Sequence, residues 1–503
     1  MAHGLHPVVL DGGVRLEPER EAALAAAPDG ALDPEFLAAI RKAFPVDVDT
    51  LPLKPVYGST FAYAAGDPSA SLRARGFAAV PSLAVGGLST VWGAAMLPYG
   101  ERDHEGWPFG RDALEPHYRA VLGFVPLAGE RDALAEGFPL YAEPRPLRTT
   151  PQVASILADL HSRGDDLRRA GVAGGRSRLA VRLDGNPHGS VCDYRGLCML
   201  GCPRRAIWGS QQTLAELLAK GLVEHRPGTI VERFEEAGDT VRLFVRGPEG
   251  RETLVTERAF VASGPLGTAR IVLASLEQYD REIALLDSAY YTFPALRLPR
   301  GQRVESPLDA GNTLAQVFIE IDDPEVSPRP VHLQLYGFND LMLRAVAARV
   351  RLREPVAARL LQPLLGRLLY VQGYLHSNVS PGARASLGRD GVLSIEGESG
   401  DIASAVGSVV AKLRSLRRVL RLEPLSPLLQ VWPPGKGFHL GGSFPMRRRP
   451  GELETDELGR LPGFRRVHLV DSSVFPTLPA TTITLAVMAN AHRIASEAVE
   501  GSG

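Results

Sequence analysis

An α/β fold is the class that the sequence predicts, and three observations favour it. Residues 7–10 form a short apolar strand that ends in Asp11. The segment RVHLVDSSVFP reads as a second buried strand, which ends at Asp471, and TITLAVMANAHRIASEAV has the spacing of a long closing helix. An acidic residue at the carboxyl end of a strand lies where α/β sheets bind ligands. These features predict a sheet of the nucleotide-binding type.

Helices and short strands are predicted to alternate through the first half of the chain. DPEFLAAIRKAF begins with a capping Asp33, GRDALEPHYRAVLGF has the same pattern around Asp112, and SQQTLAELLAK follows a capping Ser210. From Gly228 to Ala262 the pattern changes to period two, which predicts three short strands separated by glycine-rich turns.

The second half contains apolar strands and one unusual segment. FPALRLP, LAQVFIEI and PVHLQLY have the composition of strands, and an arginine-rich apolar stretch follows from Leu341 to Leu369. We interpret that stretch as amphipathic core helices, which are the common case. The alternative is a membrane-surface helix or a lid over a substrate.

Composition excludes several functional classes. The chain has 503 residues, of which 45% are hydrophobic and 22% charged, as in a soluble globular enzyme. Its formal net charge of -1 gives no reason to expect a nucleic-acid partner. Because the chain lacks an apolar run of about 18 residues and a secretory signal, we expect no integral membrane segment and a cytoplasmic location.

All three cysteines lie in one loop. Cys192, Cys198 and Cys202 are too few for a disulfide framework, and their spacing is only loosely similar to that of an iron-sulfur or zinc site. Both kinds of metal site need about four ligands. His188 is the nearest additional ligand. We therefore expect no metal.

Four separated groups of motifs occur in an order that resembles one family. They are AVGGLSTVWGAAMLP at 84–98 with WPFGRDALEPHY, GLCMLGCPRRA with TIVERF, VASGPLGTARIVLAS at 261–275, and HLGGSFPM with VDSSVFPTLPATTITLAVMANAHRIA. Together they resemble the glucose-methanol-choline (GMC) oxidoreductases over nearly the whole chain. The resemblance implies FAD-dependent oxidation of a CH–OH group to a carbonyl, in which the flavin accepts the hydride.

The resemblance also implies the partners. The substrate is a small-molecule alcohol, and a sugar or glycoside is favoured because the 84–98 loop is similar to that of pyranose oxidases. A sterol or other apolar alcohol is the alternative, suggested by the apolar segment from Leu341 to Leu369. The sequence does not assign the electron acceptor.

Two domains follow from the same resemblance. We expect a discontinuous FAD-binding Rossmann-like domain from residues 1–130, 185–276 and 436–503. An α+β substrate-binding domain is expected from residues 131–184 and 277–435.

A histidine is the expected catalytic base. His439, in FHLGG, occupies the family's catalytic-histidine position, and a neutral imidazole suits a base that takes a hydroxyl proton. The family's second catalytic Asn or His corresponds here to Thr482, and its following proline to Ile483. A threonine hydroxyl can orient an alcohol but cannot act as a second base. Compensation by His492 is the alternative.

The flavin is expected to be held noncovalently. In the pyranose oxidases, the residue before the loop tryptophan is a histidine bonded to FAD, and here it is Val91. Residues without a Cβ let the backbone approach a planar ring. We place the flavin region against Gly86, Gly87, Ser89, Trp92, Gly93 and Ile483.

The remaining cofactor contacts are carried over residue by residue. Asp11 would bind the adenosine ribose, although DGG is also a good turn, and Val231 would meet the adenine through its main chain. Gly264 would pass near the pyrophosphate, and Asp471 would lie by the ribityl and pyrophosphate groups.

The first strand of the nucleotide-binding sheet is missing from the sequence. No G-x-G-x-x-G strand and helix precede residues 7–10, and in the 3-2-1-4 order the first strand lies between that strand and the one ending at Asp471. We expect that the chain begins at an internal Met and that roughly 25 to 30 residues precede it. The alternatives are a separate polypeptide or a flavin-free relative with a binding role.

Overall fold

The computed structural model describes residues 5–27, 29–44, 54–63, 71–184, 191–298, 311–349 and 351–500, and it confirms the mixed α/β class. His188 lies outside these residues. The helices within them are α1 (Pro18–Ala25), α2 (Pro34–Ala43), α3 (Glu115–Leu122), α4 (Pro151–Ser162), α5 (Gly164–Arg169), α6 (Ser210–Ala219), α7 (Gly264–Ser275), α8 (Asp340–Arg349), α9 (Glu354–Leu365), α10 (Ala403–Ser415), α11 (Arg417–Leu420) and α12 (Thr484–Glu500).

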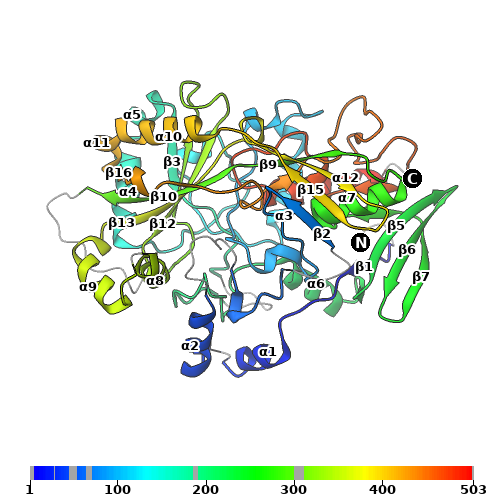
Figure 1. Cartoon of the computed structure of the whole chain (residues 1–503), viewed down its shortest axis with the longest axis horizontal. Coiled ribbons are helices and arrows are strands. Elements are labelled where there is room, and N and C mark those ends of the chain that lie inside the picture. The colour runs from blue at the N-terminus through cyan, green and yellow to red at the C-terminus, as the bar shows by residue number, and fades with distance from the viewer. Residues whose placement is uncertain are drawn as a thin grey trace.

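The largest sheet is antiparallel and occupies one side of the molecule (Figure 1). Its order is β16-β10-β13-β12-β11-β3, with β17 also paired to β10. The strands are β3 (Val172–Arg176), β10 (Tyr290–Arg297), β11 (Val317–Ile321), β12 (Val331–Gly337), β13 (Leu368–Tyr374), β16 (Leu422–Pro424) and β17 (Gln430–Val431). The three apolar strands predicted after Leu276 are β10, β11 and β12. One face of this sheet packs on α4 and α10, which share its apolar core.

A second sheet joins the large sheet to the rest of the chain. Its order is β18-β9-β14-β15-β2, and its strands are β2 (Leu72–Arg75), β9 (Ile283–Asp287), β14 (Ala383–Leu387), β15 (Leu393–Gly397) and β18 (Leu440–Gly441). Strand β9 is followed almost at once by β10. The second sheet therefore connects directly to the largest one.

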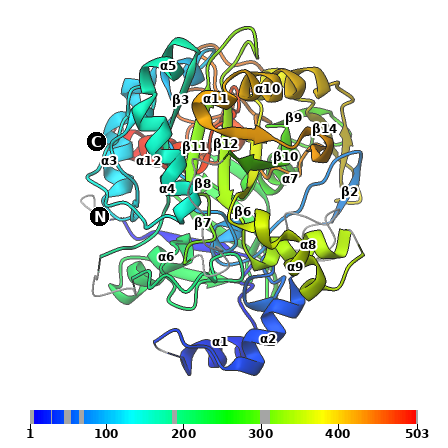
Figure 2. The same ribbon diagram turned by 90° about the vertical axis from the view of Figure 1, so that its left-hand side faces the viewer.

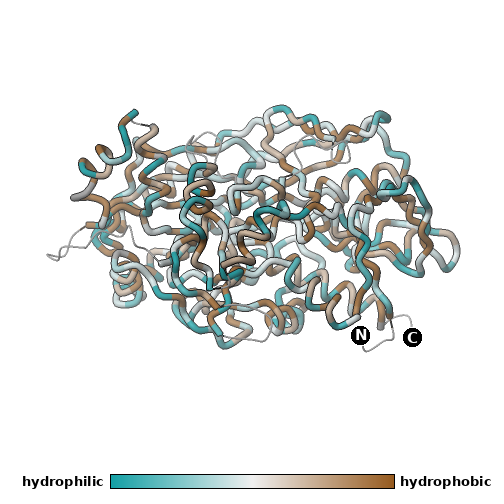
Figure 3. Tube along the Cα trace, turned by 90° about the horizontal axis from the view of Figure 1, so that it is seen from below, coloured by the Kyte–Doolittle hydropathy of each residue, from teal (hydrophilic) through white to brown (hydrophobic). Residues whose placement is uncertain are grey.

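The remaining strands form two parallel pairs and a meander. The pairs are β1 (Val8–Asp11) with β4 (Glu224–Pro227), and β8 (Ala259–Val261) with β19 (Val467–Leu469). The meander consists of β5 (Ile230–Ala237), β6 (Thr240–Gly247) and β7 (Gly250–Thr256), at the right-hand end of Figure 1. The labelled N and C ends also lie together at one end of the molecule (Figure 3).

Most predicted elements are present, but two predicted caps are wrong. Asp33 caps α2, because its carboxylate accepts from the N–H groups of Glu35 and Phe36 at 2.9 and 3.0 Å. Asp112 lies instead in a short 3-10 turn before α3. Ser210 is the first residue of α6, and its hydroxyl donates to the Gly86 carbonyl at 3.1 Å. Its partner is therefore the 84–98 loop rather than its own helix.

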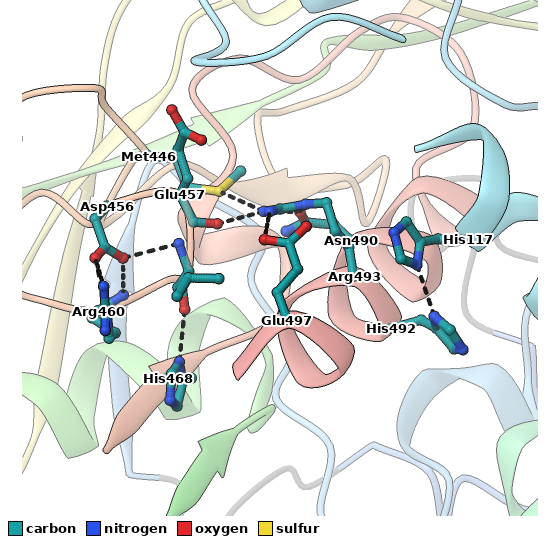
Figure 4. A network of polar contacts seen from close by, with 11 residues as sticks. His117, Met446, Asp456, Glu457, Arg460, His468, Asn490, His492, Arg493 and Glu497 are labelled. Carbon is teal, nitrogen blue, oxygen red and sulfur yellow. Dashed lines mark hydrogen bonds and ion pairs between the residues drawn. The ribbon is translucent and has the colours of Figure 1, made fainter. Parts of the chain in front are cut away.

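The closing helix α12 is fastened by polar contacts along its length (Figure 4). The buried Arg493 pairs with Glu497 at 3.0 Å and donates to Asn490 and to the Glu457 carbonyl. The Nδ1 atoms of His492 and His117 lie 2.9 Å apart and join α12 to α3. His492, the alternative base, therefore contacts a neighbouring helix.

Candidate cofactor and active site

A large cavity separates the two parallel strand pairs. It has a volume of about 2520 Å³ and is lined by β1, β8, the start of α7 and one side of α12. Within the described part of the chain, β1 pairs only with β4, and β8 only with β19. Both strands therefore leave a row of backbone groups unpaired beside the same cavity. Strand β8 pairs with β19, the strand that precedes Asp471, and β8 itself lines the cavity.

The cavity wall contains exposed apolar side chains as well as unpaired backbone groups. Five exposed large apolar side chains, from three separate stretches of the chain, line it: Leu5, Val8, Phe124, Val255 and Phe260. Small-molecule sites usually occupy about 300–1,000 Å³, so this cavity exceeds the space that such a ligand needs. It has room for a large cofactor.

Six of the predicted cofactor residues line this cavity, although they come from distant parts of the sequence. They are Asp11, Gly86, Gly87, Val231, Gly264 and Ile483.

Asp11 already has partners on both carboxylate oxygens. Its Oδ1 accepts from the Gly13 N–H at 2.9 Å, and its Oδ2 lies 3.0 Å from Nε2 of His225 on β4. The first contact is the turn interaction that DGG predicts. His225 was not singled out from the sequence, because only the pairing of β1 with β4 brings it to Asp11.

The two loop glycines differ in what surrounds them. Gly86 has a φ of +92°, and an added Cβ would approach the backbone nitrogen of Gln211 to 2.9 Å. Gly87 has a φ of +55°, and no atom lies within 4 Å of its Cβ position. Gly86 therefore permits close packing on α6, whereas Gly87 leaves open space on the cavity side.

Other loop residues hold the loop in place. Ser89 donates to the Gly86 carbonyl at 2.6 Å and accepts from the Ser210 N–H at 2.9 Å. The indole of Trp92 donates to the Trp208 carbonyl at 2.7 Å. Neither Ser89 nor Trp92 is among the residues that line the cavity, and the same holds for Gly93. The structure thus shows the first two anchoring the loop.

A buried lysine supports the same loop and was missed by the sequence analysis. The ammonium group of Lys54 donates to the Trp92 carbonyl at 2.8 Å, and burial lowers the pKa of Lys54 to about 8. Lys54 belongs to none of the motifs, so no sequence pattern singled it out. The nearby Cys198 and Cys202 are free thiols, as is Cys192. Among the described residues no cluster of three or more metal-binding side chains occurs.

Asp471 connects two elements beside the cavity. Its Oδ2 accepts from the Thr268 hydroxyl at 2.6 Å, and its Oδ1 accepts from the Ser473 N–H at 2.9 Å. Burial raises the pKa of this carboxyl, and a backbone hydrogen bond from Gly264 opposes that rise. Asp471 therefore fastens the N-terminus of α7, and it is not among the cavity-lining residues.

His439 lies between the cavity and the large sheet. Its ring stacks on Tyr374 of β13 with centroids 4.8 Å apart, and both of its sequence neighbours, Phe438 and Leu440, line the cavity. Its Nδ1 is buried without a hydrogen-bond partner among the described residues. Burial, with a smaller contribution from His332, lowers the pKa of His439 to about 3. The imidazole is therefore neutral near pH 7.

Thr482 is buried and joins the last motif to the 84–98 loop. Its hydroxyl oxygen accepts from the Leu97 N–H at 2.8 Å. The next residue, Ile483, lines the cavity and is nearly buried. The Thr482 hydroxyl thus positions the loop, and it is not hydrogen-bonded to His439.

A polar network covers the sheet next to Tyr374. The His332 ring lies 2.5 Å from the Glu320 carboxylate and 3.1 Å from the Gln334 amide. The Tyr336 hydroxyl donates to Gln334 at 2.9 Å and to Gln372 at 3.2 Å. In PVHLQLYG, polar residues alternate with apolar ones, and this period of two was the available signal for a polar sheet face.

The described residues include no helix that is both long and apolar enough to cross a membrane.

Comparison with known proteins identifies the fold. No family model matches the sequence, and no curated protein sequence matches it. A formate oxidase variant from Aspergillus oryzae RIB40 is structurally similar over 99% of both chains, with a TM-score of 0.56 and 14% identity. A second variant gives 0.52 and 15% identity over 84% of this chain and 85% of the other. Both studies concern FAD modification.

A third solved structure is also similar to this chain. Pyridoxine 4-oxidase from Mesorbium loti has a TM-score of 0.50 and 14% identity, over 98% of this chain and 99% of that one. The chain therefore has the overall fold of these oxidases.

Proposed function

We propose that this protein is an FAD-dependent oxidoreductase of the GMC type, which oxidises the CH–OH group of a small-molecule alcohol to a carbonyl. The observation that carries the proposal is the position of His439. A neutral imidazole with an unpartnered buried nitrogen lies between a cofactor-sized cavity and a polar sheet face. The cavity is the FAD site, and residues 131–184 and 277–435 form the substrate domain.

The residues around the cavity fit a noncovalent flavin. Gly87 and Gly264 both leave their Cβ positions open, with no atom within 4 Å, and Gly264 begins the 12-residue helix α7. Helix N-termini favour negatively charged groups such as a pyrophosphate. Val91, at the position of the covalent histidine, is buried and has no group that bonds to a flavin.

Three residues of the chain would have separate roles in the reaction of the substrate. His439 accepts the hydroxyl proton of the alcohol, because its lowered pKa keeps it unprotonated. Tyr374 fixes the plane of the imidazole by stacking on it. Thr482 holds the final motif to the 84–98 loop through Leu97. When bound, FAD supplies the hydride acceptor.

The polar network favours a substrate with several hydroxyl groups. A pocket that hydrogen-bonds each hydroxyl rejects analogues that lack one, because its buried polar groups are then left unpaired. Gln334, Tyr336 and Gln372 supply such groups on neighbouring strands. We therefore keep a sugar or glycoside ahead of a sterol or other apolar alcohol as the substrate.

Flavin reduction under anaerobic conditions tests the catalytic assignment. A panel of sugars, glycosides and sterols is mixed with the flavin-loaded protein, and the loss of visible flavin absorbance is followed. His439→Ala should keep its flavin and lose about 10²–10⁴-fold in reduction rate. His161→Ala, on the exposed side of α4, is the matched control. Unchanged reduction by His439→Ala would remove this histidine from the mechanism.

The pH profile gives a second readout of the same assignment. Because the pKa of His439 is lowered to about 3, the base stays neutral and the reduction rate should not fall between about pH 8 and pH 5. A base of ordinary histidine pKa would instead lose activity below about pH 6.5.

The cofactor is tested by visible absorption of this 503-residue chain and of a version extended upstream by a G-x-G-x-x-G strand and helix. Yellow protein in either form supports the FAD proposal, and colour in the extended form alone shows that the added segment completes the site. Two soluble, colourless proteins after addition of FAD would favour a binding role without flavin.

A further inference from the structure

Helix α9 carries a line of exposed apolar side chains, which we call the α9 stripe. Leu352 lies just before the helix, and Val356, Leu360 and Leu364 follow at intervals of four residues. Their exposed fractions are 40%, 45%, 64% and 36%. Residues four apart are neighbours on one side of a helix. Within α9, Val356, Leu360 and Leu364 therefore form one apolar surface, and the interpretation of this segment as core helices holds only for its other side.

The opposite side of α9 fixes its orientation. Ala357 and Leu365 are buried, and they form a small separate core with Phe338, Leu343 and Leu368. This core packs α9 on α8 and on the start of β13. Figures 1 and 2 show the two helices together at the edge of the molecule. The stripe therefore points outward because the other side of the helix is already packed.

Positive charge surrounds the stripe. Residues 341–369 contain six arginines and one glutamate, which gives a formal charge of +5 in a chain whose net charge is -1. Arg351, Arg353 and Arg359 are exposed. The glutamate, Glu354, pairs with Arg344 at 3.7 Å. The exposed charges beside the stripe are thus predominantly cationic.

We propose that α9 docks on an anionic lipid surface, with the α9 stripe in the interface and the arginines at the headgroups. Helices that lie in a membrane interface combine an apolar side with flanking Lys or Arg residues. Anionic headgroups attract juxtamembrane arginines. A second copy of this chain fits less well, because a two-fold interface through the stripe would bring two cationic surfaces together. This proposal is independent of the proposed redox activity.

Vesicle flotation tests the docking. The purified chain should float with vesicles made of equal parts phosphatidylcholine and phosphatidylglycerol, and it should stay behind with phosphatidylcholine alone. Leu360→Asp should weaken flotation by about tenfold or more, because a leucine leaves the apolar interface. Arg359→Gln should weaken it by about fivefold. Added salt should weaken the wild type, since screening reduces the attraction.

Thr253→Asp is the control, because it adds the same charge at an exposed residue of β7, which lies at the other end of the molecule from α9 and outside the cavity lining. It should float like the wild type, and circular dichroism should show all variants folded. No flotation of the wild type, or equal flotation of Leu360→Asp, would overturn the proposal. A concentration-dependent dimer that Leu360→Asp abolishes would overturn it in favour of self-association.

Discussion

The large sheet and the cavity-lining strands differ in how completely their strands are paired and buried. Strand β12 pairs with β11 and β13 along most of its length, and all seven of its residues are buried. Among the described residues, strand β1 pairs on one side only, and none of its four residues is buried. Inner strands of the large sheet such as β12 thus have partners on both sides and a complete core around them. Strands β1 and β8, beside the cavity, each have only one partner strand within the described part of the chain.

This contrast makes the large sheet the more sensitive region. Buried polar groups there depend on specific partners, whereas the cavity side chains have few neighbours to lose. Substitutions of the same kind in the two regions should therefore differ widely in their effect on stability.

The largest effect is expected from the buried ion pairs behind the large sheet. Asp159 on α4 pairs with Arg297 of β10 and with Arg421, at 2.8 Å for the latter. Asp159→Asn would leave two arginine charges without their carboxylate, at a cost of about 3–5 kcal/mol. Urea unfolding measures this loss. The exposed Asp165→Asn, which breaks a pair with Arg168, should cost less than about 1 kcal/mol. Similar losses in both variants would contradict the contrast.

A pair of leucines compares the two regions directly. Leu333 on β12 is fully buried, so Leu333→Ala should cost about 2–5 kcal/mol by leaving a cavity in the core. Leu5, beside β1, is 43% exposed, and Leu5→Ala should change stability by less than about 0.5 kcal/mol. Both are measured by urea unfolding. A large loss from Leu5→Ala would show that something covers the cavity wall in solution.

The same contrast explains what the sequence could predict. Period-two and helical patterns located β10–β12, the meander and α12, because each is a local consequence of side-chain burial. The short strand β8 was included in the meander, since three residues carry too little pattern and its partner β19 lies more than 200 positions away. The predicted caps of α3 and α6 are wrong because Asp112 lies within a 3-10 turn and the Ser210 hydroxyl donates to the Gly86 carbonyl.

Candidate site residues that belong to sequence motifs could be predicted. Contacts of the site that join distant parts of the chain could not. Six of the predicted cofactor residues line one cavity, as an ordered set of motifs suggested. The Asp11–His225 contact and the support of Trp92 by Lys54 needed the tertiary structure. The low pKa of His439 follows from burial, which no motif encodes.

A change in pH dependence is expected at the junction of the two regions. Asp287 ends β9, beside Leu440 of β18, and accepts from the Gly435 N–H at 2.8 Å, while its Oδ1 is buried without a partner among the described residues. Burial raises the pKa of Asp287 from 3.8 to about 7. Between these values the folded protein holds a proton that the unfolded chain releases. The free energy of unfolding should therefore fall as pH rises, by at most about 1.4 kcal/mol per pH unit.

Asp287→Asn removes this titration, so the variant's stability should change less with pH than that of the wild type between about pH 4 and pH 7. Urea unfolding at several pH values measures the slope, and Asp165→Asn, which leaves Asp287 in place, should keep the wild-type slope. Asp159 and Asp287 are both buried, but only Asp159 has arginine partners. If Asp287→Asn kept the wild-type slope, the carboxyl would be ionised in the folded protein, and a counter-charge or water in the cavity region would have to stabilise it.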